Sequence, residues 1–315
     1  MLLPNLAYFA VACIFLAVSS IILVKLLKNI AALLKITDFA AAFIIMAAAT
    51  SLPELFVGIT SALRGEPALS FGNILGANML DATLILGLIV IAAGGIKMDE
   101  KGLQRDSIFM LLMAMLPVIL FIIGGSISRA DGVILVSSFI AYSYFTARNR
   151  KRSKKKSEKK KGAAKAIFSI VFFLIFLFIL FRSADSVVKY ASALAIDFKL
   201  PAIVIGIFLV SIGTTMPELT FGVCSALLKE GEMGLGDQVG TVIFNSTFIV
   251  GVTALIHPIT ASFSPFIITS VFLLFASLLT IKFVKSGKTL TVKEGILLIL
   301  VYAAFAIVSF RFNSF

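Results

Sequence analysis

The chain has 315 residues, of which 60% are hydrophobic and only 14% are charged, and its formal net charge is +12. Stretches of about 18 or more apolar residues recur along the whole length, which excludes an ordinary soluble domain and predicts a protein that crosses a membrane many times. Much of the positive charge lies in residues 148–165, which we interpret as one loop beside anionic lipid, so we expect no nucleic-acid partner.

Ten apolar segments are predicted in chain order, five on each side of the basic loop. Their bounds are 5–27, 37–63, 70–94, 107–126, 130–147, 166–186, 199–228, 235–257, 264–284 and 293–311. We therefore divide the chain into an N-terminal five-helix repeat (1–147), a basic cytoplasmic linker (148–165) and a C-terminal five-helix repeat (166–315). An odd number of spans in each half gives the second half the opposite orientation, so the repeat is inverted.

Lysine and arginine residues are unevenly shared between the two sets of predicted loops. When the spans alternate, most of them fall on the side of the 148–165 loop, even if that loop is left out of the comparison. The positive-inside rule places that side in the cytoplasm. We therefore expect a multi-pass protein of the cell membrane, with the lipid bilayer as its partner and with both termini outside.

One motif occurs twice, in the second and the seventh predicted spans, at an offset of 164 positions. The sequence TSLPEL at residues 50–55 returns as TTMPEL at residues 214–219. Each copy places one glutamate, Glu54 or Glu218, beside a proline inside an apolar segment, where an ionisable residue is interpreted as functional. Two such residues in matching halves predict a membrane transporter with a central cation site.

The prolines of the motif, Pro53 and Pro217, predict broken helices. Proline has no backbone N–H and clashes with the carbonyl four residues earlier, so carbonyls near 47–50 and 211–214 lose their partners. Such carbonyls persist inside a membrane only where they line a cavity or bind something. Together with two carboxylates and nearby hydroxyls they form a set of hard oxygen ligands that suits Ca²⁺ and also Na⁺. The lack of nearby His or Cys argues against a soft transition metal.

A polar stripe follows each motif in the next span. Its residues are spaced by four, on one helical face: Asn73, Ala77 and Asp81 in the first half, and Asp237, Thr241 and Asn245 in the second. Glycine pairs beside them (Gly72 with Gly76, Gly236 with Gly240) allow helices to approach closely. We interpret Asp81 as part of the site, and Asp237, near a predicted span end, as a solvated entrance residue.

These residues resemble the motifs of the cation/calcium exchanger superfamily, which carry a G-T-S-x-P-E core followed by G-N-x-x-G-S-N. The chain is most similar to prokaryotic sodium/calcium exchangers. The resemblance implies that Ca²⁺ is held by Glu54 and Glu218 with the carbonyls of Thr50 and Thr214. It also implies Na⁺ sites built from the same four residues together with Ala47, Ser51, Asp81, Ser211, Thr215, Thr241 and Asn245.

The implied activity is secondary antiport by alternating access, with Ca²⁺ and Na⁺ competing for shared ligands while the spans 5–27 and 166–186 slide across the core. We expect an all-α membrane protein of ten transmembrane helices, in two inverted repeats with helices broken at the midplane. We expect no cofactor, and a functional monomer, because one chain already contains a complete site. We do not expect an enzyme, because no nucleophile–base pair accompanies the carboxylates.

The chain departs from the family pattern at positions that bear on coupling. Ala77 stands where the family usually has Ser, Asp81 where several relatives have Asn, and Asn245 where they have Asp. These departures leave the number of Na⁺ ions and the involvement of K⁺ or H⁺ open. A Ca²⁺/H⁺ antiporter and a K⁺-involving exchanger therefore remain as alternatives, as does a cation channel.

Overall fold

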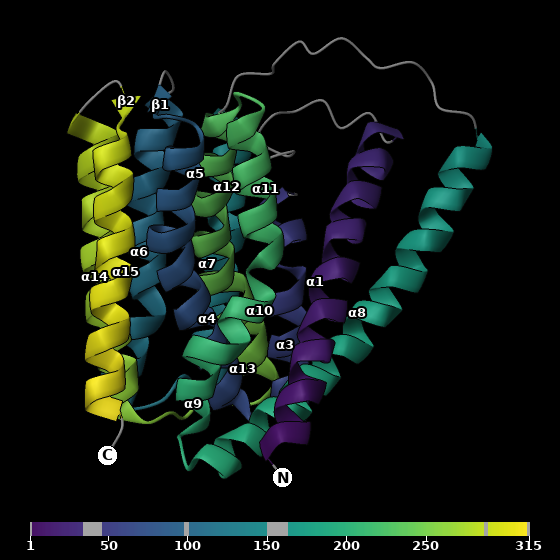
Figure 1. The fold of residues 1–315 in the computed structure, drawn as a ribbon, viewed down its shortest axis with the longest axis vertical. Coiled ribbons are helices and arrows are strands. Elements are labelled where there is room, and N and C mark those ends of the chain that lie inside the picture. The colour runs from purple at the N-terminus through teal and green to yellow at the C-terminus, as the bar shows by residue number, and fades with distance from the viewer. Residues whose placement is uncertain (1, 34–45, 98–100, 150–162, 287–288, 314–315) are drawn as a thin grey trace.

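The computed structural model describes residues 2–33, 46–97, 101–149, 163–286 and 289–313, which fold as a bundle of helices (Figure 1). In the first half the helices are α1 (Leu2–Leu33), α3 (Leu52–Leu63), α4 (Pro67–Met79), η1 (Leu80–Ile85), α5 (Leu86–Ala92), α6 (Lys101–Gly124) and α7 (Arg129–Asn149). In the second half they are α8 (Ala163–Phe198), α9 (Ala202–Ile205), η2 (Gly206–Val210), α10 (Ser211–Thr214), α11 (Met216–Leu227), α12 (Gly231–Phe244), η3 (Asn245–Ile249), α13 (Val250–Ile256), α14 (Phe263–Ser286) and α15 (Val292–Asn313).

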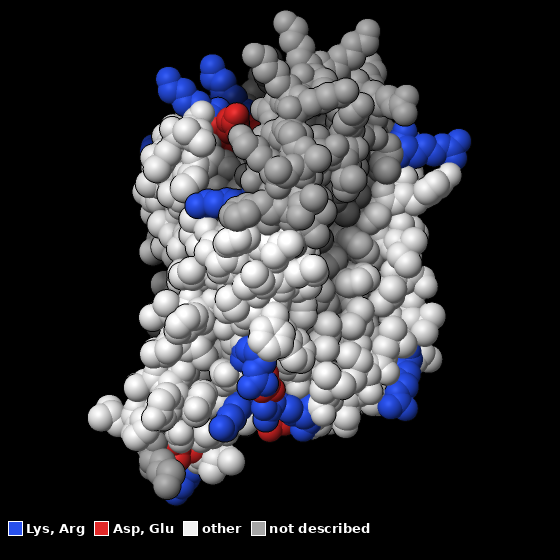
Figure 2. Space-filling model, turned by 90° about the vertical axis from the view of Figure 1, so that its right-hand side faces the viewer, with Lys and Arg blue, Asp and Glu red and all other residues white. Residues whose placement is uncertain are grey.

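The helices have the lengths and the apolar character of a multi-pass membrane protein. Among the described residues, seven are long and apolar enough to cross a bilayer, or eight if the bent pair 202–214 and 216–227 counts as one span. The predicted span 37–63 begins outside the described residues, and its described part contains the short helix α3. Figure 2 shows charged side chains gathered towards the two ends of one face, with a broad uncharged band between them.

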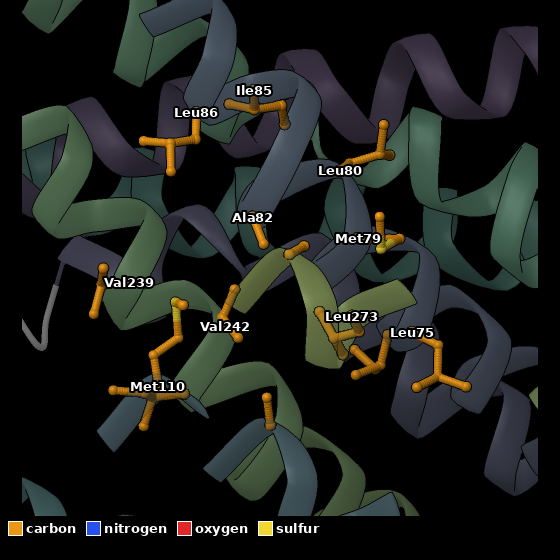
Figure 3. Packing of buried hydrophobic residues seen from close by; sticks show 14 of the residues in the cluster. Leu75, Met79, Leu80, Ala82, Ile85, Leu86, Met110, Val239, Val242 and Leu273 are labelled. Carbon is orange, nitrogen blue, oxygen red and sulfur yellow. The ribbon is translucent and has the colours of Figure 1, made fainter. Parts of the chain in front are cut away.

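Two hydrophobic clusters divide the bundle. The larger cluster joins α4, η1, α6, α12 and α14, where Leu75, Met79, Val242 and Leu273 pack together (Figure 3). The smaller one lies between α1 and α8 and reaches α3 and η2. The helices α1 and α8 therefore form a pair that packs mainly on itself, beside a larger core.

The two halves repeat the same helix contacts. Helix α3 packs against α4 and α13, and its counterpart α11 packs against α12 and α5. After α5, β1 (Ile96–Lys97) pairs antiparallel with β2 (Thr289–Leu290), which precedes α15. The helix α6 then runs the length of the bundle (Figure 1), and at the other end Ile127 forms an antiparallel bridge with Ile259, which follows α13.

Helix α4 meets the segment α9–η2 with no side chains between the two backbones. A Cβ atom added to Gly72 would lie 2.1 Å from the carbonyl oxygen of Ile203, and one added to Gly76 would lie 2.2 Å from that of Ile207. Gly206 in turn faces the backbone of α4. The predicted role of Gly72 and Gly76 in close helix packing is confirmed, and any larger residue would force the two helices apart.

Helix α8 continues twelve residues beyond the predicted span 166–186. The hydropathy falls after Phe181, but Val187, Val188, Ala191, Leu194 and Ala195 are buried at helical spacing. Because that spacing keeps one apolar face against the bundle, the helix extends to Phe198 and the expected loop is replaced by helix.

The C-terminal half of α8 is held against the rest of the molecule by polar contacts. Arg64, at the end of α3, lies 2.6 Å from Asp185 on α8. The Ser192 hydroxyl of α8 donates a hydrogen bond to Glu66, in the turn between α3 and α4. The equivalent turn of the second half, residues 228–230, is exposed.

Candidate cation site

Both copies of the motif interrupt a helix at the same position. In the first half, residues 46–50 are helical, Ser51 leaves the helix, and α3 begins at Leu52. In the second, α10 ends at Thr214, Thr215 leaves the helix with nearly the same backbone angles, and α11 begins at Met216. The axis bends there by 45°. The proline that follows each turn cannot donate to the carbonyl four residues earlier, so the predicted helix breaks are confirmed.

The two motif glutamates lie in the first turns of the helices that follow these breaks. Glu54 in α3 and Glu218 in α11 are each fully buried. Their four carboxylate oxygens make no well-formed hydrogen bond among the described residues, and the Thr214 side chain is the polar group that acts on the Glu54 charge. The N-terminus of a helix favours a negative charge, yet burial of an unpaired carboxylate costs several kcal/mol, so these oxygens are suited to a cation.

The carboxylates of the two halves face a common region. The charge of Glu54 acts on both Asp81 and Glu218, and that of Asp237 acts on the same two residues. Like charges in a buried region of low dielectric constant repel one another even when they are not in direct contact. A cation between the carboxylates would replace that repulsion with attraction, so the region is suited to binding a cation.

The polar stripes reach the region at points where the helices widen. Asp81 lies in η1 and Asn245 begins η3, and both are π-helical turns. Both side chains are fully buried, and their terminal N and O atoms have no hydrogen-bond partner in the described part of the chain. Single π-turns inside α-helices frequently occur at functional sites, and here they occur at matching positions of the two halves.

Hydroxyl groups link the motif of each half to the stripe of the other. The Thr50 and Thr241 hydroxyl oxygens are 3.5 Å apart. The Thr214 hydroxyl donates to the Oδ1 atom of Asn73 over 3.0 Å. The position equivalent to Thr241 in the first half is Ala77, so Thr214 has no hydroxyl partner there.

All eleven residues that the sequence predicts as cation ligands are buried around the breaks and stripes. Their exposed fractions are at most 3% for Ala47, Thr50, Ser51, Glu54, Asp81, Ser211, Thr214, Thr215, Glu218, Thr241 and Asn245. Several hydroxyls already donate to backbone carbonyls; for example, that of Thr215 donates to Ser211 over 2.8 Å. A hydroxyl that donates in this way keeps its lone pairs for a cation.

The interpretation of Asp237 as a solvated entrance residue is wrong. Its exposed fraction is 2%, and it lies within reach of the Asp81 and Glu218 charges. The reason is that α12 begins at Gly231, four residues before the predicted start of the span, which moves Asp237 into the body of the helix. Its place on the stripe, four residues before Thr241, was the signal that pointed to the site.

One buried polar contact had no signal in the sequence. The Asn78 side-chain amide on α4 donates to the Ser246 hydroxyl in η3 over 2.7 Å, and both residues are buried. The equivalent positions in the opposite halves are Val242 and Ala82. Since neither residue recurs in the repeat, the comparison of the halves could not reveal this link.

The donor atoms available here are mixed oxygens. In the described part of the chain, no group of three or more His, Cys, Asp or Glu side chains converges as a metal site. A cation held between the breaks therefore depends on hydroxyl and backbone carbonyl oxygens as well as on the glutamates. Ca²⁺ accepts such a set, since it takes six to eight oxygens in flexible geometry.

The chain matches one family model over nearly its whole length. The family is described as sodium/calcium exchanger protein, and the match covers residues 4–148 and 168–311. The sodium/calcium exchanger MaX1 of Methanosarcina acetivorans is 28% identical over 98% of this chain and 99% of that protein. The uncharacterized membrane protein MJ0091 of Methanocaldococcus jannaschii is 29% identical over 77% of this chain and 79% of that protein.

The chain is also similar to solved structures of a sodium-calcium exchanger. The sodium-calcium exchanger NCX_Mj, soaked with 10 mM Na⁺ and no Ca²⁺, aligns with a TM-score of 0.69 and 29% identity. The alignment covers 99% of this chain and all of NCX_Mj. A second structure of NCX_Mj, soaked with 100 mM Na⁺ and 10 mM Sr²⁺, aligns equally well at 28% identity.

Proposed function

Since this chain belongs to the sodium/calcium exchanger protein family, as a prokaryotic-type member of the cation/calcium exchanger superfamily, we propose that it is a secondary antiporter that exchanges Na⁺ for Ca²⁺ by alternating access. One observation carries the proposal. Two fully buried glutamates, without well-formed hydrogen bonds among the described residues, lie at matching helix breaks of the two halves. Their charges act on each other, so a single divalent cation can neutralise both.

The proposed Ca²⁺ ligands are the carboxylates of Glu54 and Glu218 and the carbonyls of Thr50 and Thr214. Each threonine directly precedes the residue that leaves the helix, so its carbonyl lies at the end of a helical segment. Each glutamate lies four residues later, in the first turn of the next helix. This arrangement supplies two charges and several neutral oxygens, which together offset the cost of removing water from Ca²⁺.

The proposed Na⁺ ligands share this set and extend it along the stripes. They are the same four residues with Ala47, Ser51, Asp81, Ser211, Thr215, Thr241 and Asn245. Since Ca²⁺ and Na⁺ use the same glutamates, full binding of one excludes full binding of the other, and exchange follows from that competition. If more than two Na⁺ ions move per Ca²⁺, the membrane potential contributes about 2.3 kcal/mol per net charge per 100 mV.

The proposed architecture is ten transmembrane helices in two inverted repeats, residues 1–147 and 166–315, joined by a cytoplasmic linker at 148–165 with both termini outside. Three observations support it. The family model matches each half separately, the halves repeat their helix contacts, and the two termini lie at the same end of the bundle (Figure 1). We further propose that the monomer is functional, because every site residue comes from one chain.

A Ca²⁺/H⁺ antiporter is the second candidate, and the buried carboxylate Asp81 favours it. A third acid beside Glu54 and Glu218 is a further group that could carry a proton. A K⁺-involving exchanger is consistent with the same residues. The three functions differ only in the ion that drives Ca²⁺ uptake.

The test is radioactive Ca²⁺ uptake into proteoliposomes loaded with Na⁺, with K⁺, or with buffer of lower pH. We expect uptake only with internal Na⁺. Glu54→Gln should abolish it, while Glu230→Gln, a matched change at an exposed residue before α12, should not. Uptake that is driven by the pH gradient and indifferent to Na⁺ would replace Na⁺ by H⁺ as the coupling ion, and a requirement for K⁺ would favour the K⁺-involving exchanger.

A further inference from the structure

A groove lies along the seam between α1 and α8, and none of its lining residues belongs to the proposed cation site. Its volume is about 320 Å³. Apolar side chains on its wall are well exposed: the exposed fractions are 51% for Val11, 58% for Phe15 and 66% for Phe178. The remaining wall residues are Tyr8, Ala12, Ile179, Arg182, Ser183, Ser186 and Tyr190. In a membrane protein, exposed apolar surface of this kind is covered by acyl chains.

The groove contains one strong cation. The Arg182 side chain lies in its wall and is 65% exposed. Its guanidinium is 3.9 Å from the Asp185 carboxylate, but Asp185 is engaged more closely by Arg64, at 2.6 Å. One carboxylate therefore faces two arginines, and a net positive charge remains at the groove. A phosphate accepts the planar, multiple donors of an arginine well.

Two stacked tyrosines mark the polar end of the same seam. The rings of Tyr8 on α1 and Tyr190 on α8 are 5.2 Å apart and nearly parallel. The ammonium group of Lys189 lies 5.3 Å from the centre of the Tyr190 ring. Tyrosines gather at the level of lipid headgroups, so the groove runs from that level towards the apolar interior, past Arg182 to Phe15 and Phe178. On the face seen in Figure 2, basic side chains lie below the uncharged band.

We propose that this groove binds an anionic glycerophospholipid. One acyl chain lies along Val11, Phe15 and Phe178, and the phosphate pairs with the Arg182 guanidinium. The occupant is a membrane lipid because the groove joins exposed apolar side chains to the Arg182 guanidinium, near two stacked tyrosines, a combination that soluble anions cannot satisfy. The site is independent of which cation the protein exchanges. It lies between the two helices that pack mainly on each other, so a lipid bound here contacts both.

The binding test is native mass spectrometry of the purified protein with equal amounts of phosphatidylglycerol and phosphatidylcholine of identical acyl chains. We expect the wild type to retain phosphatidylglycerol about five-fold better, the effect of one basic side chain beside an anionic lipid. Arg182→Gln should abolish the preference. Arg311→Gln, at an exposed arginine near the end of α15, should preserve it. Equal retention of both lipids by the wild type, or an unchanged preference in Arg182→Gln, would overturn the proposal.

A second variant tests whether the groove holds an acyl chain, without changing the charge of Arg182. Val11→Trp fills the groove from an exposed position and leaves Arg182 in place. We expect it to lower the retention of both lipids, while inorganic phosphate, added as a competitor, displaces neither. If Val11→Trp retains lipid like the wild type, or if phosphate displaces phosphatidylglycerol, the groove is not an acyl-chain site and the binding is superficial. A thermal unfolding curve for each variant identifies any loss that is due to misfolding.

Discussion

The two halves of the molecule have the same backbone at the site but different side chains. Both break a helix one residue after a threonine, and both widen into a π-turn where the stripe reaches the centre. The first stripe, however, carries an amide, a methyl group and a carboxylate at positions 73, 77 and 81. The second carries a carboxylate, a hydroxyl and an amide at 237, 241 and 245.

The two halves share some features of the site and differ in others. The backbone breaks and the two glutamates recur, so the geometry of the centre requires both halves. The stripe residues do not recur, although each stripe contains one aspartate. The four buried acids of the site are thus divided equally between the halves, but the two aspartates occupy different positions on the stripes. We expect any difference in ion coupling between this chain and its relatives to arise at these positions.

The largest effect is expected where the halves are equivalent. Glu54→Gln and Glu218→Gln should each reduce the initial rate of Ca²⁺ uptake by about 100-fold or more, because removing one member of a buried charge cluster costs about 2–5 kcal/mol. Both variants should remain monodisperse, since neither side chain makes a well-formed hydrogen bond among the described residues. Near-normal uptake by either variant would mean that the glutamates do not share one ion.

The position of the Asp81 carboxylate is tested by moving it to the equivalent position, Asn245, of the other half. Asp81→Asn should raise the Na⁺ concentration for half-maximal exchange by about ten-fold or more, because an interaction with a charged group contributes about 1.5–3 kcal/mol. Adding Asn245→Asp should restore most of the loss, since it returns the acid from the other half. A Na⁺ titration of both variants decides the question. If the double variant is worse than Asp81→Asn alone, the position of the acid matters more than its presence.

A smaller effect is expected from the hydroxyls. Thr241→Ala makes the second half resemble the first and should raise the half-maximal Na⁺ concentration by about five-fold, the value of one neutral polar contact of about 1 kcal/mol. Ala77→Ser adds a hydroxyl at the matching position and should lower it. The same Na⁺ titration measures both changes, and a thermal unfolding curve for each variant shows whether its packing is intact. Identical titrations for the wild type and Thr241→Ala would remove this residue from the Na⁺ set.

The smallest effect concerns the two ends of the bundle. Arg64→Ala breaks the ion pair with Asp185. The side chains of Arg64 and Asp185 are 38% and 27% exposed, so the loss of stability should be no more than about 1 kcal/mol. We expect the ratio of the apparent Ca²⁺ affinities measured from the two sides of the membrane to change by up to about five-fold. Arg311→Ala should leave the ratio unchanged. An equal change in both variants would trace the effect to surface charge in general.

The candidate site is recognisable in the sequence because its signals are local or repeated. A proline next to a glutamate in an apolar segment predicts both the break and the buried acid, and a chance pairing of the two would not recur at the matching position of the other half. The burial of Asp237 does not follow from hydropathy, because α12 begins four residues before the apolar segment does. In α8, hydropathy ended the helix too early, although the apolar spacing of Val187, Ala191 and Leu194 continues.

Other features depend on contacts that no local pattern encodes. A π-turn adds one residue to a helical turn and is stabilised by what surrounds it, so Leu80–Ile85 has no signature of its own. The Asn78–Ser246 contact joins residues 168 positions apart. The repeat helps only where both halves keep the same residue, and here they do not.

The contact of α4 with α9–η2 has a mechanical consequence. Because the backbones touch at Gly72 and Gly76, no layer of side chains is present that could repack and let one helix glide along the other. The two segments, one from each half, touch backbone to backbone, and the Thr214–Asn73 hydrogen bond joins α4 to α10, which directly follows η2. If the proposed exchange takes place, we expect the centre of the molecule to behave as one rigid block and the helices around it to move.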